Sequence, residues 1–72
     1  MNTRVIVRAV DYANVSIGRD LRLMRERAGL SQIDVARAAK MQPAMLCRIE
    51  SGKGNPTIDT VARIARAIER MS

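Results

Sequence analysis

Arginine side chains supply most of the chemistry available to this 72-residue chain. They account for eleven of the thirteen basic residues, against seven acidic ones, and the formal net charge is +6. A guanidinium group presents a planar fork of donors that fits phosphate oxygens and the edge of guanine. The charge therefore favours a nucleic acid as partner, although a merely soluble basic protein would have the same composition.

Catalytic and metal chemistry have little support in the sequence. It contains no histidine and one cysteine, Cys47, which leaves no disulfide within the chain, no zinc cluster and no histidine acid–base catalyst. No nucleophile lies beside a base, and no phosphate-binding loop is present. We therefore expect no enzyme activity, no cofactor and no metal.

The remaining composition indicates one small helical domain. A chain of this length buries roughly 60% of the surface of its unfolded form. With one tyrosine and no phenylalanine or tryptophan, its core must be aliphatic. No apolar run approaches the ~20 residues of a membrane span, and Arg4 and Arg8 interrupt the start of the chain, unlike a signal peptide. We expect no membrane partner and a cytoplasmic location.

The segment 30–54 predicts two short helices joined by a tight turn. Ser31, with Asp34 three residues later, is typical of a helix start, so the first helix begins at Gln32. Its small inner residues, Ala36 and Ala39, allow close packing.

The second helix of this segment has Pro43 at its first position and ends at Gly52. Leu46 and Ile49 lie on one side of it. The opposite side is small or basic, with Ala44, Cys47, Arg48 and Ser51. A surface of this kind can approach base edges closely, as the second helix of a helix-turn-helix does in the major groove of DNA.

Two further helices are predicted on either side of this pair. The first extends from a cap at Ser16 to Arg27 and is ended by Gly29. The last follows a cap at Thr57 and has the inner stripe Ile58, Val61, Ile64, Ala65, Ile68 and Met71. We expect its arginines, Arg63, Arg66 and Arg70, to form a solvated face.

Residues 1–16 differ from the rest of the chain. Thr3, Val5, Val7 and Ala9 alternate with Arg4, Ile6, Arg8 and Val10. Three consecutive β-branched residues in this stretch favour an extended strand over a helix. One strand needs a partner, and the same strand of a second copy is the simplest one. A partly disordered arm and an arm whose Arg4 and Arg8 touch DNA are the alternatives.

The motifs S31-Q32-x-x-V35-A36, R48-I49-E50-S51-G52-K53 and N55-P56-T57 resemble the phage-repressor and Cro-like (XRE-type) family of small bacterial helix-turn-helix regulators. Arg25 and the run from Gly29 to Gln32 extend the resemblance, which covers about 17–68. It implies an all-α, compact four-helix, lambda-repressor-like domain at 17–72 after an N-terminal extension at 1–16. It also implies a bacterial or phage-encoded protein.

The resemblance implies a homodimeric repressor that reads a palindromic operator in double-stranded DNA. It implies an ion pair between Arg25 and Glu50 that fixes the orientation of the helices. The residues expected to read bases are Arg48, Ala44, Pro43, Cys47 and Ser51, and those expected to bind phosphates are Gln32, Gln42, Lys53, Gly54 and Asn55.

Three departures from the family pattern affect these expectations. Lys40 stands where the turn usually has glycine, so a left-handed backbone there would cost roughly 1 kcal/mol. Gln42 replaces the usual serine or threonine cap. Pro43 and Ala44 occupy positions that commonly carry polar base-reading side chains, which leaves more of the readout to Arg48.

A second functional class is also consistent with the sequence. Some relatives are antitoxins, which neutralise a toxin protein and repress their shared operon. The extension at 1–16 and the outward apolar residues Leu23, Ile33 and Met45 would suit such a protein partner. RNA binding is less well supported, because the aromatic stacking residues of RNA-binding modules are missing.

Overall fold

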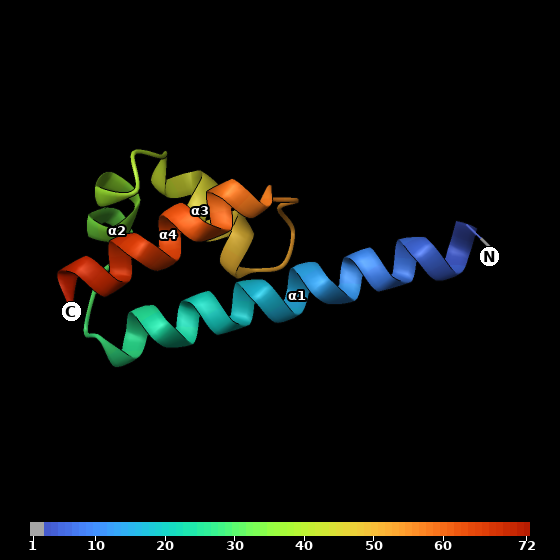
Figure 1. Cartoon of the computed structure of the whole chain (residues 1–72), viewed down its shortest axis with the longest axis horizontal. Helices are drawn as coiled ribbons and strands as arrows, with labels where there is room; N and C mark the ends of the chain where they lie inside the picture. Colours follow the sequence, from blue (N-terminus) through green and yellow to red (C-terminus); the bar gives the residue numbers. More distant parts are fainter. Residues whose placement is uncertain (1–2) are drawn as a thin grey trace.

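A computed structural model of the chain describes residues 3–72, which form four helices. They are α1 (Thr3–Arg27), α2 (Gln32–Ala38), α3 (Pro43–Glu50) and α4 (Ile58–Met71). Helices α3 and α4 pack against the C-terminal half of α1, α2 packs against α3 and α4, and the N-terminal half of α1 extends beyond them (Figure 1). Within residues 3–72, no helix combines the length and apolar character needed to cross a membrane.

The predicted strand at the N-terminus is wrong, because the chain is helical from Thr3 onward. Ser16 caps nothing and lies inside α1, so the expected boundary between 16 and 17 falls within one continuous helix. Extending an existing helix avoids the cost of nucleation, which outweighs the few tenths of a kcal/mol that each β-branched residue costs in a helix. A strand, in contrast, would find no partner strand among residues 3–72.

The core is aliphatic and is shared by all four helices. Its fully buried residues are Leu21, Val35, Ala36, Ala39, Leu46, Ile49, Ile64, Ala67 and Ile68. The inner stripe predicted for α4 is correct from Val61 onward, but Ile58 is 89% exposed. Ile58 is the first residue of α4, and its side chain faces solvent.

Most of the predicted helix ends are confirmed. The hydroxyl of Ser31 accepts from the amide of Asp34 at 3.0 Å, and that of Thr57 accepts from the amide of Thr60 at 3.1 Å. Gln42 makes no side-chain cap, as expected of a poor capping residue, and Pro43 follows it at the first position of α3. Lys40 adopts φ 58° in the turn between α2 and α3, the strained conformation that its replacement of glycine predicts.

The arginines of α4 do more than face solvent. The guanidinium of Arg63 donates to the carbonyls of Ala39 and Lys40, and Arg70 donates to that of Ala38. These carbonyls belong to the end of α2 and its turn, where backbone acceptors lack partners within the helix. Arg66 and Arg70 are exposed as predicted, whereas Arg63 is partly buried, and both Arg63 and Arg70 tie α4 to the end of α2.

Gly18 allows a close approach between α1 and the end of α3. It lies on the side of α1 that meets the end of α3, and a Cβ atom there would overlap the backbone carbonyl of Ile49. The conflict is with backbone atoms, which cannot rotate away as a side chain can. The packing of α1 against α3 therefore requires glycine at this position.

We predict that Gly18→Ala lowers the free energy of unfolding by about 2–3 kcal/mol, the usual cost of overpacking a core. In an exposed helix the same change would stabilise by about 1 kcal/mol. Gly29→Ala is the matched control, since its Cβ would meet no atom within 4 Å and only its φ of +70° opposes the change. Urea denaturation should rank Gly18→Ala as the more destabilising variant. The reverse ranking would contradict this packing.

Candidate nucleic-acid interface

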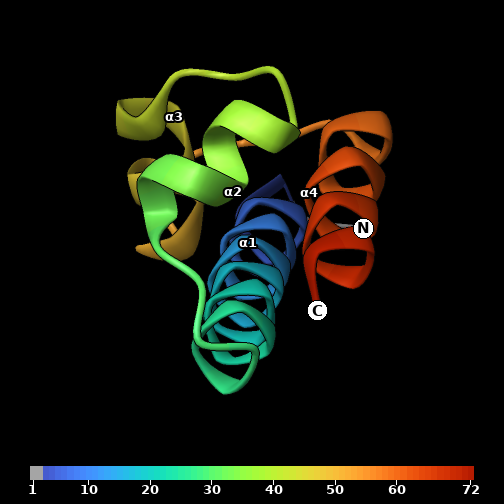
Figure 2. The same ribbon diagram turned by 90° about the vertical axis from the view of Figure 1, so that its left-hand side faces the viewer.

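Helix α3 presents one side to solvent and the other to the core. Leu46 and Ile49 are 0% and 2% exposed and fix the inner side. The outer side is formed by the five residues that the sequence assigned to base reading, all of them exposed: Pro43, Ala44, Cys47, Arg48 and Ser51. Figure 2 shows α3 at one edge of the molecule, partly overlapped by α2 in this view, with α1 and α4 farther to one side. The outer side of α3 is therefore accessible along its length.

The side chains on this outer surface are small except for Arg48. Ala44 and Cys47 add little bulk, and Cys47 is a free thiol. The hydroxyl of Ser51 donates to the carbonyl of Cys47 at 2.8 Å, so its oxygen remains as an acceptor. Arg48 is the only cation among the residues of α3.

The end of α3 is held by a buried carboxylate. Glu50 is 6% exposed and is the only buried charged residue among those described. Arg25 of α1 donates to it twice, from Nε at 2.8 Å and Nη2 at 2.9 Å. Gln32 of α2 donates to the same carboxylate at 3.0 Å, and Arg25 also donates to the carbonyl of Leu30. One carboxylate thus joins α1, α2 and α3.

The electrostatics of this pair are those of a strong charge-assisted bond. The hydrogen bond from Arg25 to Glu50 raises the pKa of the Arg25 guanidinium above its usual value, with burial opposing the rise. The pairing therefore favours the charged form of Arg25. The resemblance implied this pair, but the contribution of Gln32 could not be read from the sequence because it depends on how α2 crosses α3.

We predict that Glu50→Gln lowers the free energy of unfolding by about 3 kcal/mol, because the partly buried guanidinium of Arg25 loses its counter-charge. Glu26→Gln is the matched control. Glu26 pairs with Arg22 at 3.1 Å, but both side chains are at least half exposed, so its loss should cost under about 1 kcal/mol. Chemical denaturation of both variants tests the difference. Equal losses would show that burial of the Arg25–Glu50 pair contributes nothing.

The residues that the sequence assigned to phosphate binding lie around α3 but are not equally available. Gln42 and Lys53 are exposed at either end of the helix. The amides of Lys53 and Gly54 both donate to the carbonyl of Arg48, so they close the end of α3. Asn55 accepts a hydrogen bond from Asn14 of α1 at 3.3 Å. Lys53 and Gln42 therefore keep the most freedom to meet a ligand.

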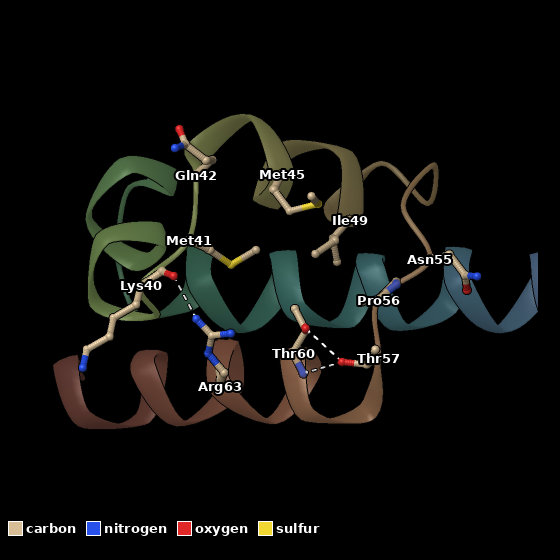
Figure 3. A pocket seen from close by; sticks show the side chains of 10 residues that line it. All are labelled: Lys40, Met41, Gln42, Met45, Ile49, Asn55, Pro56, Thr57, Thr60 and Arg63. Atoms are coloured by element: carbon tan, nitrogen blue, oxygen red, sulfur yellow. Dashed lines mark hydrogen bonds between the residues drawn. The ribbon is translucent and has the colours of Figure 1, made fainter.

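A pocket of about 340 Å³ opens between α3 and the start of α4. Met41, Met45, Ile49 and Pro56 form its apolar walls, and Arg63 and Thr60 lie on the α4 side (Figure 3). Thr60 is engaged with Thr57, and Arg63 with the turn at Lys40. The polar groups on the α4 side are thus already bonded within the fold.

The comparisons with known proteins agree with this geometry. The sequence model of a family described as a helix-turn-helix domain matches residues 16–70, which is most of the chain. Neither the comparison with curated proteins nor that with solved structures gives a significant match. The matched region begins two residues before Gly18 and includes all of α2, α3 and the loop that follows.

Proposed function

Because the chain belongs to this helix-turn-helix family, we propose that it is a sequence-specific regulator that binds double-stranded DNA with α3 in the major groove. The observation that carries the proposal is the contrast between the two sides of α3. Its inner side is buried, and Glu50 at its end is bonded to α1 and α2. Its outer side is exposed and carries small side chains together with Arg48. A rigid helix of this kind can enter a groove about 12 Å wide.

We assign the main base contact to Arg48. Its guanidinium fork can donate to O6 and N7 of guanine, and such a contact is worth roughly 1–3 kcal/mol of discrimination. The methyl group of Ala44 suits contact with the methyl group of thymine. Pro43, Cys47 and Ser51 border these two positions and add shape and one hydroxyl acceptor.

Phosphate contacts on either side of the groove would set the register. We assign them first to Lys53 and Gln42, which lie exposed at the two ends of α3. Asn55 and the backbone at Gly54 belong to the loop beside Lys53. Gln32 gives one amide hydrogen to Glu50 and has a second one left for a phosphate.

We further propose that two copies bind a palindromic operator and act as a repressor. One domain of this size reads few base pairs, and two-fold symmetry doubles the site and its specificity. Binding-site selection from random duplexes at a stated salt concentration tests this. Enrichment of an inverted repeat that contains guanine in each half supports the proposal. Recovery of no sequence above the non-specific background would contradict it.

We predict that Arg48→Ala weakens binding to the selected site about tenfold to a hundredfold while changing non-specific binding little. Lys53→Ala should weaken both by a similar factor and reduce the salt dependence, because a phosphate contact carries no sequence information. Competition titrations with specific and random duplexes measure both ratios. If the two variants lose specificity equally, Arg48 does not read a base.

A second candidate function is that of an antitoxin. It is favoured by apolar side chains on α2 and α3 that face solvent, Ile33 at 56% and Met45 at 50% exposed. A toxin covering them would bury this surface. Co-purification of a defined toxin-sized partner from the native source, lost in an Ile33→Asp variant, would support that role.

A further inference from the structure

The N-terminal part of α1 is a helical arm that the domain itself does not cover. Residues 3–13, here called the arm, are all exposed and project past the other helices (Figure 1). The arm is nevertheless apolar, with Val5, Ile6, Val7 and Val10 between 45% and 54% exposed. An isolated helix of this length, rich in β-branched residues, is marginal in water. The apolar side chains of the arm are therefore uncovered by the other described residues.

The apolar residues of the arm are not scattered evenly around it. Ile6, Val10 and Ala13 follow one another at spacings of four and three, so they lie on one side of α1. The same spacing continues into Ile17 and Leu21, which pack in the core. The arm therefore presents the same apolar side as the core-facing part of α1, but with nothing over it among the described residues.

We propose that the arm pairs antiparallel with the arm of a second copy, and that this pair forms the dimer on which the proposed function rests. With the two-fold axis near residue 8, Ile6 of each copy lies opposite Val10 of the other. Small residues, Thr3 and Ala13, meet at the ends. This register buries the largest side chains of the stripe against each other, and pairs of this kind are the usual seam between two helices.

The length of the arm supports a second copy of the chain as its partner. Gly18 touches the end of α3 and lies ten residues beyond the axis, so the two copies of Gly18 would be about 30 Å apart along the helices, at 1.5 Å per residue. The earlier residues of α3 lie farther from the arm (Figure 1). The two α3 helices would thus be separated by somewhat more than 30 Å, close to the ~34 Å between successive major grooves on one face of DNA.

The contact would be weak on its own. Two helical segments of this length cover on the order of 600–800 Å² in total, below the roughly 1,200 Å² of stable interfaces. We therefore expect dissociation in the micromolar range for the free protein. Adjacent half-sites on DNA would raise the effective concentration of the two arms and complete the dimer.

Val10→Asp tests the arm with a matched control in Val5→Asp. Both change valine to aspartate in the arm at similar exposure, but Val5 lies about 120° away from the stripe. Sedimentation equilibrium of the full chain should show wild type and Val5→Asp associating to dimers. Val10→Asp should weaken association at least about tenfold. Ile6→Asp provides a second variant, and circular dichroism checks that each remains folded.

Several results would overturn the proposal. The first is wild-type protein that stays monomeric up to high micromolar concentration. The second is a Val10→Asp variant that associates as strongly as the wild type. The third is an equal loss of association in Val10→Asp and Val5→Asp. Weaker binding of Val10→Asp to a single half-site would instead assign the arm to DNA.

A spacing experiment connects the arm to the operator. Inserting about five base pairs, half a helical turn, between selected half-sites should abolish cooperative binding by the wild type. The Val10→Asp variant should bind both spacings alike. Because sedimentation needs no DNA, its result stands even if no specific site is found. Failure of the proposed function and failure of the arm pairing are thereby distinguished.

Discussion

The structure depends on a buried carboxylate where three helices meet. Glu50 ends α3, and the groups that satisfy its charge come from α1 and α2. A buried charge without these partners would be strongly destabilising, so α3 is favoured in the orientation that keeps Glu50 beside both neighbours. Gly18 acts at the same point, since it lets the backbones of α1 and α3 approach closely. The position of the outer surface of α3 follows from these two constraints.

The residues that hold α3 in place and the residues proposed to read bases lie on opposite sides of the helix. Leu46 and Ile49 hold α3 from its buried inner side, and the five residues proposed to read bases are exposed on the outer side. Arg63 adds a further tie by closing the end of α2, from which the turn to α3 starts. A helix fixed in this way loses little conformational entropy when it enters a groove. The outer residues can then vary without disturbing the fold.

The arm gives α1 two different environments. Its C-terminal half is covered by α3 and α4, whereas residues 3–13 continue the same apolar side into solvent. The apolar side of the first half of α1 is therefore uncovered in a single copy of the domain. If the arm pairs as proposed, the helix that anchors α3 in each copy would also set the distance between the two copies.

The sequence by itself determined the elements from Ile17 onward, the caps at Ser31 and Thr57, and the two sides of α3, because spacing and capping act over a few residues. It also implied the partners Arg25 and Glu50 by resemblance. Tertiary structure decided the rest. Local propensity favoured a strand at the N-terminus, but continuity with α1 made it a helix. Gly18, Gln32 and Arg63 acquired their roles only where helices cross, since those contacts join residues distant in the chain.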